Sequence, residues 1–286
     1  MSSASQQRVI LVTGANKGIG FEIVKKLAEE SSNNNVILLG SRELKRGQDA
    51  LVRLGSPSHM HLLQLDLSSR ESIARATDEI KCKYGGRLDV VINNAATGEL
   101  ELTVDLAREM FSVNYYGIKT LNEHLFPLMQ ENGRVVNVAS ACGLTVLYEA
   151  SKDLQEKYSL STLTIEELDR LVEDFISAVG TNSFEELGYN PRSSYLIYSV
   201  TKAAVIALTR IEARQWSGAK NVLVLSVCPG FCATDLNKNA PGARPAEFGA
   251  DSILYVVNAP ETRLENGCFY RDGQLLPQIG MMNRKN

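Results

Sequence analysis

The fold is decided by the stretch VILVTGANKGIG, residues 9–20. The apolar run Val9 to Val12 predicts a buried strand, and apolar residues at helical spacing predict a helix from Ile19 to Glu30. Glycines between a strand and a helix permit a tight turn, a close approach of the backbone to a pyrophosphate, and close helix–strand packing. The helix amino terminus also favours a negative charge. The stretch therefore predicts a dinucleotide-binding turn, although glycine-rich turns without a ligand also occur.

The rest of the chain repeats this alternation of short apolar runs and longer helical patterns, which is typical of βαβ units around a parallel sheet. Strands are predicted at Val9–Val12, Val36–Leu39, Leu62–Leu65, Val90–Ile92, Val135–Val138, Val222–Val227 and Cys268–Tyr270. Helices are predicted at Ile19–Glu30, Leu44–Leu54, Ser69–Tyr84, Leu106–Gln130, Tyr198–Trp216 and Ala246–Val257. We therefore predict one doubly wound, Rossmann-type α/β domain over residues 1–286, with a seven-stranded parallel sheet and helices on both faces. Its ligand should lie outside the carboxyl ends of the strands.

The composition is that of a soluble globular chain, with 286 residues, 44% hydrophobic, 22% charged and a net charge of −3. Basic residues are not clustered, so we expect no nucleic-acid partner. Apolar runs fall short of the ~18 residues of a membrane span, and Met1 to Arg8 is too polar for a signal peptide. The five cysteines are scattered and never form a CxxC pair, which indicates reduced thiols rather than a metal site. We expect a cytoplasmic protein without membrane or metal binding.

An insert at about residues 141–195 interrupts the alternation, because more than fifty residues separate Ser140 from Tyr198. Within it, Thr164 and Glu167 have the spacing of a capping box at a helix start. Apolar residues follow at helical spacing and predict a face that packs on the body: Leu168, Leu171, Val172, Phe175, Ile176 and Val179. The acidic residues that fall largely off this stripe are interpreted as a solvated face: Glu166, Glu167, Asp169, Glu173 and Asp174.

Cofactor choice depends on the end of the second predicted strand, where enzymes that use NAD place an acid that binds the ribose hydroxyls. This chain has Gly40-Ser41-Arg42 there. Arg42 and Lys17 are both able to reach a ribose 2′-phosphate, which favours NADP(H) over NAD. Glu43 would repel that phosphate if the strand were longer by one or two residues, and otherwise stabilises the first turn of the next helix.

The catalytic prediction begins with Tyr198 and Lys202, which are four residues apart and therefore share one face of a helix. We expect a nearby ammonium to lower the pKa of Tyr198 from about 10, which makes it a general acid for a carbonyl oxygen. Ser140 directly follows an apolar strand and is placed to donate a hydrogen bond to the same oxygen. A Tyr and a Lys at this spacing are also common on protein surfaces. Tyr195 is a poorer candidate because Ser199 stands four residues after it.

The chain resembles the short-chain dehydrogenase/reductase family in four motifs that occur in the family's order. These are the glycine turn, Asn93-Asn94-Ala95-Ala96, Ser140 and the YxxxK of residues 198–202. The insert, GSRELKRG (40–47), GRVVNVAS (133–140) and CPGFCATDL (228–236) are similar to the family's monomeric NADPH-dependent carbonyl reductases. The resemblance implies a cytosolic reductase of aldehydes, ketones and quinones, with hydride passing from the cofactor to the carbonyl carbon. It also implies a monomer, because the insert helix would cover the surface through which shorter relatives pair.

The resemblance further assigns roles to single residues. Asn114 would anchor a water that relays protons to Lys202, unless it bonds its own helix backbone. Asp66 would bond the adenine, unless it caps the following helix. The amide of Cys232 and the hydroxyl of Thr234 would hold the nicotinamide carboxamide and so fix the face that delivers hydride. The full implied cofactor-binding set is Gly14, Asn16, Lys17, Gly18, Ile19, Gly20, Arg42, Asp66, Leu67, Asn93, Ala95, Tyr198, Lys202, Pro229, Gly230, Cys232 and Thr234, with Asn114, Ser140, Tyr198 and Lys202 catalytic.

Two other functions fit the sequence. The insert and a substrate loop at about residues 235–248 would set specificity, so the chain could serve one steroid, terpenoid or pterin-like substrate. A noncatalytic NADP(H)-binding sensor on the same fold is the other alternative. A sensor needs the glycine turn but has no use for Ser140, Tyr198 and Lys202 together.

Overall fold

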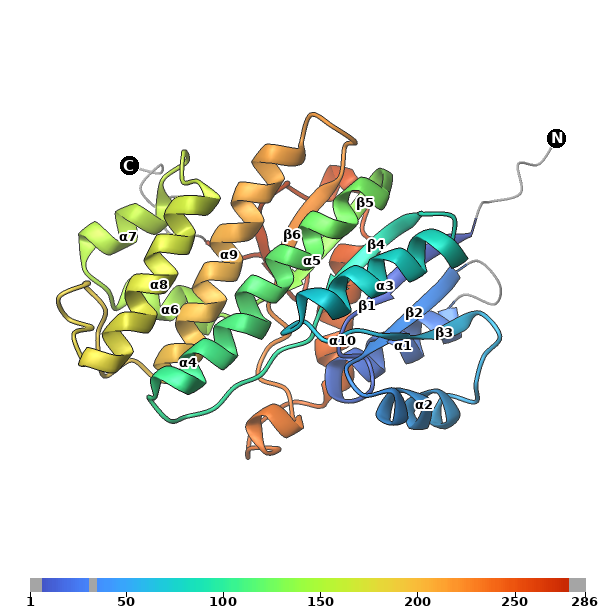
Figure 1. Cartoon of the computed structure of the whole chain (residues 1–286), viewed down its shortest axis with the longest axis horizontal. Coiled ribbons are helices and arrows are strands. Elements are labelled where there is room, and N and C mark those ends of the chain that lie inside the picture. The colour runs from blue at the N-terminus through green and yellow to red at the C-terminus, as the bar shows by residue number, and fades with distance from the viewer. Residues whose placement is uncertain (1–6, 31–34, 278–286) are drawn as a thin grey trace.

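The computed structural model describes residues 7–30 and 35–277, and its described part is built around an eight-stranded sheet with helices on both faces (Figure 1). The strands lie in the order β3-β2-β1-β4-β5-β6-β7-β8. Their bounds are β1 Arg8–Val12, β2 Asn35–Ser41, β3 Met60–Gln64, β4 Leu88–Asn93, β5 Met129–Val138, β6 Leu223–Val227, β7 Phe269–Arg271 and β8 Gln274–Leu275. Strands β1 to β7 pair in parallel, which confirms the predicted doubly wound fold.

The sheet differs from the prediction at its last strand, because β8 adds an antiparallel edge to β7. Asp272 and Gly273 form the turn between them with φ of 49° and 78°. Two consecutive residues with positive φ are typical of the two-residue hairpin turn, and an Asp-Gly pair suits it. A strand of two residues contains too little apolar sequence to be predicted from periodicity.

Two hydrophobic cores lie on opposite faces of the sheet. One is covered by α1 (Gly18–Glu30), α2 (Leu44–Arg53) and α10 (Ala246–Asn258). The other is covered by α3 (Arg70–Lys83), α4 (Val104–Phe111), α5 (Ile118–Leu125) and α9 (Leu196–Trp216), as Figure 1 shows. Because both faces of the sheet are buried, the central strands have apolar side chains on both sides. Their sequences are therefore continuous apolar runs.

The single helix predicted at Leu106–Gln130 is wrong, because the segment is divided. A π-helical turn, η1 (Ser112–Gly117), separates α4 from α5, and a 3₁₀ turn, η2 (Phe126–Leu128), ends the helical region. Pro127 has no amide hydrogen to donate, and β5 then begins at Met129 rather than at Val135. Single π-turns inside α-helices occur mostly at functional sites, and this one contains Asn114.

The insert forms α6 (Cys142–Tyr148), α7 (Lys152–Ser159) and α8 (Ile165–Thr181). The predicted capping box is present: the Thr164 hydroxyl accepts from the Glu167 amide at 3.2 Å, and the Glu167 carboxylate accepts from the Thr164 amide at 2.9 Å. The apolar side chains at Leu168, Val172 and Phe175 are fully buried. Helix α8 packs on α4 and α9 (Figure 1).

The interpretation of the acidic side of α8 as a solvated face is wrong for Asp169, which is partly buried, whereas Glu173 is exposed as expected and still accepts a hydrogen bond. Asp169 accepts from the Tyr115 hydroxyl at 2.8 Å and pairs with the Lys119 ammonium at 2.6 Å, and Glu173 accepts from the Tyr116 hydroxyl at 2.6 Å. Burial and the neighbouring carboxylates raise the pKa of both tyrosines. These bonds fasten the insert helix to the π-turn.

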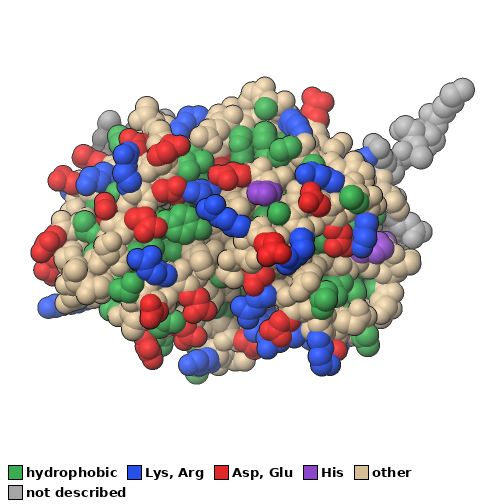
Figure 2. Space-filling view, in the orientation of Figure 1, with side chains coloured by type: hydrophobic (Ala, Val, Ile, Leu, Met, Phe, Trp, Pro, Cys, Tyr) green, Lys and Arg blue, Asp and Glu red, His purple; other side chains and the backbone are tan. Residues whose placement is uncertain are grey.

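On the face drawn in Figure 2, side chains of both charge signs are interspersed with apolar ones over the whole surface. Across residues 7–30 and 35–277, none of the helices combines the length and the hydropathy needed to cross a membrane. In the same residues no cluster of His, Cys, Asp and Glu side chains suits a metal ion.

Candidate active site

Tyr198 and Lys202 lie one turn apart near the start of α9, as their spacing predicts. The Lys202 side chain is buried, and its ammonium donates to the Val138 carbonyl at the end of β5 over 2.9 Å. The same nitrogen lies 5.5 Å from the centroid of the Tyr198 ring. The pair therefore lies at the carboxyl ends of the strands, where a doubly wound fold binds its ligand.

The expected lowering of the Tyr198 pKa is wrong. Burial raises the pKa of Tyr198, and a hydrogen bond with Ser140 opposes only part of that effect. The Lys202 ammonium, 5.5 Å from the centroid of the Tyr198 ring, does not outweigh this effect of burial. Burial also lowers the pKa of Lys202 to about 8. At neutral pH Tyr198 therefore keeps its proton, which is the state that a proton donor needs.

Ser140 follows β5 by two residues and joins Tyr198 through the hydrogen bond between their side chains. Its hydroxyl also accepts from the Cys142 amide at 3.3 Å, a contact that fixes the side chain at the start of α6. The strand-end serine and the helical tyrosine, 58 residues apart in the sequence, thus meet as predicted. Two hydroxyl groups are then available to one substrate oxygen.

Asn114 does not bond its own helix, so that alternative is wrong. Its fully buried amide accepts from the Thr97 amide at 2.9 Å and donates to the Thr97 carbonyl at 2.8 Å and the Thr201 hydroxyl at 3.2 Å. Asn114 thereby connects the loop after β4 to the residue beside Lys202. Its role in holding a water stays a prediction.

The glycine turn is built around contacts that exclude larger side chains. Gly14 has φ of 63°, and a Cβ on it would lie 2.9 Å from the Cα of Ala95. Gly18 has φ of 57°, and a Cβ there would lie 3.4 Å from the Thr234 methyl group. The turn, Ala95 and Thr234 therefore lie together, and their backbone is free to approach a pyrophosphate closely. These residues fit a dinucleotide cofactor.

Asn94 supports this turn and was not predicted. Its side-chain amide donates to the Thr13 carbonyl at 2.9 Å, while the Thr13 hydroxyl accepts from the amides of Asn94 and Ala95, both at 3.0 Å. A Cβ on Gly20 would lie 2.5 Å from the Asn94 amide nitrogen. Ala96, which stands where the family has glycine, has no positive φ, so its methyl group causes no strain.

Basic residues gather at one end of the turn. A cavity of about 310 Å³ is lined by Asn16, Lys17, Asp49, Ala50, Arg46, Arg53 and Asp235. Lys17 forms an exposed ion pair with Asp235 at 2.8 Å. Strand β2 ends at Ser41, so Glu43 lies past the strand, where it pairs with Arg46 at 3.0 Å and with Arg42 at 3.8 Å. Arg46, in the first turn of α2, was not predicted, because Arg42 precedes the helix and only the shared partner Glu43 links the two arginines.

Three predicted residues use their side chains elsewhere. Asn93 is fully buried and its side chain donates to Asn122 and Asn137, each at 2.7 Å, so its backbone is the part available to a cofactor, and its predicted contact there stays a prediction. Leu67 is buried in the core, and Ile19 packs towards α10. Leu67 can therefore offer only its backbone to a cofactor, whereas Ile19 is partly exposed.

Asp66 lies just past β3 and does not cap α3, because Ser69 occupies that position. The Asp66 carboxylate accepts from the amide and the hydroxyl of Ser68 at 3.0 and 2.7 Å. The alternative role as a helix cap is therefore wrong. Its contact with an adenine stays a prediction.

The segment Pro229–Thr234 follows β6 and faces the glycine turn through Thr234. Asn237 holds its end by donating to the Cys232 carbonyl at 2.9 Å and accepting from the Thr234 amide at 3.1 Å. Leu236 extends towards the catalytic pair: a Cβ on Gly98 would lie 3.2 Å from Leu236 and 3.3 Å from Tyr198. The substrate loop therefore begins directly beside the proton donor.

Comparison with known proteins shows which family has this arrangement of residues. The family model described as short chain dehydrogenase matches residues 8–161, and the model described as Enoyl-(Acyl carrier protein) reductase matches residues 156–256. A Rattus norvegicus protein named carbonyl reductase (NADPH) 3 is 36% identical over 283 residues, which cover 95% of this chain and 98% of that protein. A Capsicum annuum (+)-neomenthol dehydrogenase is 32% identical over 310 residues, covering 92% and 96%. The structure of salutaridine reductase from Papaver somniferum matches with a TM-score of 0.81 at 28% identity, covering 92% of this chain and 99% of that one.

The chain belongs to the short-chain dehydrogenase family. The match spans nearly the whole length of the relatives, so the likeness includes the insert and the substrate loop as well as the glycine turn.

Proposed function

We propose that this protein is an NADPH-dependent carbonyl reductase that converts aldehydes, ketones or quinones to alcohols. The observation that carries the proposal is the meeting of Ser140, a protonated Tyr198 and the buried Lys202 at the carboxyl end of β5. The relatives named carbonyl reductase support the same activity.

NADPH, when bound, supplies the hydride that attacks the carbonyl carbon. The chain's own residues then control the oxygen. Tyr198 donates its proton to that oxygen, and the Ser140 hydroxyl donates a hydrogen bond that stabilises the developing negative charge. The Lys202 ammonium lies close enough to stabilise the tyrosinate that remains after the transfer. Asn114 connects the helix that carries Lys202 to the loop after β4, and so keeps the site rigid.

The basic residues around the turn favour NADP(H). Lys17, Arg42 and Arg46 lie where a ribose 2′-phosphate would follow β2, and guanidinium groups bind phosphate through paired donors. Glu43, the acid that could repel the phosphate, is already paired with both arginines. Glu43 is therefore neutralised rather than presented to the cofactor.

The substrate side is apolar at its rim. Leu236 lies beside Tyr198 and is 42% exposed, and Leu100 and Phe231 are also exposed in the neighbouring loops. Exposed apolar side chains beside a reactive group favour an uncharged, apolar carbonyl compound. One dedicated terpenoid-like ketone is the second candidate, because the relatives include a (+)-neomenthol dehydrogenase.

We further propose a cytoplasmic monomer. All five cysteines are free thiols, which suits a reducing compartment. Helix α8 covers parts of α4 and α9, the surface through which shorter members of the family would pair. Sedimentation at micromolar concentration tests this, and a stable dimer would contradict it.

The activity is tested with purified protein, NADPH and a panel containing a quinone, an aromatic aldehyde, a steroid ketone and menthone, followed by NADPH absorbance. Tyr198→Phe should lower turnover by about a hundredfold or more, because the proton donor is lost. Unchanged turnover in Tyr198→Phe would contradict the proposed mechanism. Reduction of menthone alone would favour the dedicated enzyme.

A further inference from the structure

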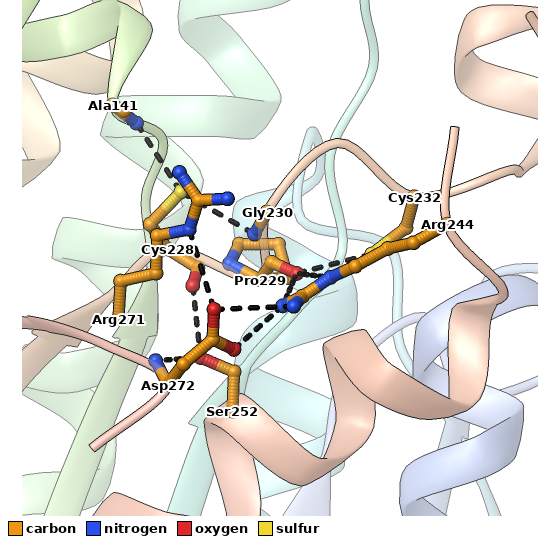
Figure 3. Close-up of polar contacts among 9 residues, drawn as sticks. All are labelled: Ala141, Cys228, Pro229, Gly230, Cys232, Arg244, Ser252, Arg271 and Asp272. Carbon is orange, nitrogen blue, oxygen red and sulfur yellow. Dashed lines mark hydrogen bonds and ion pairs between the residues drawn. The ribbon is translucent and has the colours of Figure 1, made fainter. Parts of the chain in front are cut away.

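Arg244 lies in the substrate loop and touches the segment that follows β6. Figure 3 shows its guanidinium between the Pro229 carbonyl and the Asp272 carboxylate. The three residues come from distant parts of the chain: Pro229 lies in the loop after β6, Arg244 lies two residues before α10, and Asp272 lies in the turn between β7 and β8. None of them belongs to the proton-donating group at Tyr198.

The Arg244 guanidinium binds two partners at the same time, the Pro229 carbonyl and the Asp272 carboxylate. Its Nε and Nη2 donate to the Pro229 oxygen at 3.2 and 2.5 Å, and its Nη1 and Nη2 bind the two oxygens of Asp272 at 3.1 and 2.7 Å. The Arg244 backbone adds further bonds, donating to the Phe231 carbonyl and accepting from the Ala233 amide, both at 2.8 Å. The residue therefore holds the segment on both sides of Cys232.

Gly230 makes room for this contact. Its φ is 78°, and a Cβ on it would lie 2.7 Å from Nε and 2.8 Å from Cζ and Nη2 of Arg244. The guanidinium is thus packed against the Gly230 backbone, in a position that any larger residue would block. Glycine at this position serves the contact with Arg244 as well as the turn itself.

Asp272 is itself anchored to the same segment. Its amide donates to the Ser252 hydroxyl at 2.8 Å, and that hydroxyl donates to the Cys228 carbonyl at 3.0 Å (Figure 3). Arg244 lowers the pKa of Asp272, so the carboxylate stays ionised. Cys228, Ser252, Asp272, Arg244 and Pro229 therefore form a closed chain of contacts around the start of the segment.

We propose that Arg244 is a positioning residue that fixes Pro229–Thr234 in the geometry required for hydride transfer. The inference rests on the proposed function, in which the Cys232 amide and Thr234 hold the nicotinamide. Displacing that segment would misalign the hydride without touching the groups that bind the adenosine half of NADPH. Because Arg244 also lies in the substrate loop, the same contact links substrate binding to the orientation of the nicotinamide.

The arrangement requires arginine rather than any cation. A guanidinium presents its donors in a rigid planar fork, whereas a lysine ammonium is a single point of charge on a flexible chain. Lysine at position 244 would reach Pro229 or Asp272 but would not hold both in the observed geometry. Arg244→Lys should therefore behave much like Arg244→Ala, although it keeps the charge.

The test measures single-turnover hydride transfer in Arg244→Ala, Arg244→Lys and Asp272→Asn, using NADPH deuterated at each C4 position in turn. We expect a rate lower by about tenfold to a hundredfold in Arg244→Ala, and transfer from the second C4 position into the alcohol, while binding of the adenosine half of NADPH is unchanged. Asp272→Asn should shift both quantities in the same direction. Arg75→Ala, which removes an exposed ion pair on α3, is the matched control and should change neither.

A role in overall stability alone would reduce the amount of active enzyme but leave the rate per active site and the face of transfer unchanged. Unchanged rate and face in Arg244→Ala, or full wild-type behaviour in Arg244→Lys, would overturn the proposal. Asp272→Asn decides the question if the Arg244 variants do not fold.

Hydrogen exchange of the backbone amides tests the positioning role of Arg244 without requiring catalytic activity, so its result does not depend on the proposed function. In protein without substrate, the amides of residues 230–235 should exchange faster in Arg244→Ala than in the wild type, while those of α3 remain unchanged. Wild-type protein that oxidises NADPH with none of the carbonyl compounds would refute the proposed function. Equal exchange of residues 230–235 in the two proteins would refute the positioning role, whatever the activity.

Discussion

Raising the pH should switch the enzyme off through Lys202. Burial removes solvation from the ammonium and lowers its pKa from 10.5 to about 8, an effect that Cys228 and Cys142 oppose only in part. The ammonium donates to the Val138 carbonyl at 2.9 Å and lies over the Tyr198 ring. Burial disfavours the charged form of a lysine, so the proton is held below that pKa and lost above it. At pH 9, one unit above this pKa, only about a tenth of the molecules keep the Lys202 proton.

The assay is the pH dependence of single-turnover carbonyl reduction at saturating NADPH, between pH 6 and pH 10. The rate should be flat below pH 7 and then fall tenfold per unit above about pH 8, because the tyrosinate left by proton transfer loses its cationic neighbour. Tyr198 does not produce this fall by losing its own proton, because burial raises its pKa. Lys202→Arg is the control, since arginine stays protonated throughout and should shift the fall beyond pH 10. A rate that stays constant to pH 10 in the wild type, or an identical fall in Lys202→Arg, would refute the reasoning.

Three further predictions concern the turn, the phosphate site and the insert. Arg42→Ala should weaken NADPH binding by about tenfold and leave NADH binding unchanged, as measured by fluorescence titration, because one phosphate-binding cation is lost. Gly14→Ala should abolish cofactor binding, since the new methyl group meets Ala95 at 2.9 Å and φ is 63°; calorimetric titration measures it. Asp169→Ala should lower the free energy of unfolding in urea by about 1–3 kcal/mol, because Tyr115 loses its hydrogen-bond acceptor.

Matched variants serve as controls for these changes. Lys45→Ala removes an exposed cation next to the phosphate site and should leave NADPH affinity unchanged. Gly218→Ala introduces a methyl group with open space around it and should preserve cofactor binding. Glu156→Ala, on the exposed side of α7, should leave stability unchanged. If a control variant changed affinity or stability as much as its test variant, the contact named for that test variant would not be the cause of the change.

The features that the sequence predicted well depend on local geometry. Tyr198 and Lys202 share a face because a helix repeats every 3.6 residues, and the glycine turn follows from a strand, three glycines and a helix in succession. Thr164 and Glu167 form their capping box because both partners lie within one turn. Such features need no knowledge of which distant segments meet.

The errors all depend on distant contacts. The sign of the Tyr198 pKa shift was wrong because the burial of a side chain is set by the elements that pack around it, not by the residue four positions away. Asp169 was interpreted as solvated because nothing in its own helix indicates that Tyr115 and Lys119 lie against it. Arg244 was missed for the same reason, since its partners stand 15 and 28 residues away and belong to other elements.

The central claim is that hydride passes from NADPH to a carbonyl carbon while Tyr198 supplies the proton. The most direct measurement is mass spectrometry of the alcohol formed from an unlabelled aldehyde or ketone with C4-deuterated NADPH. The wild type should give an alcohol that carries one deuterium on the former carbonyl carbon when the reactive C4 position is labelled, and Tyr198→Phe should give almost none. Wild-type protein that binds NADPH but forms no deuterated alcohol from any compound in the panel would contradict the account.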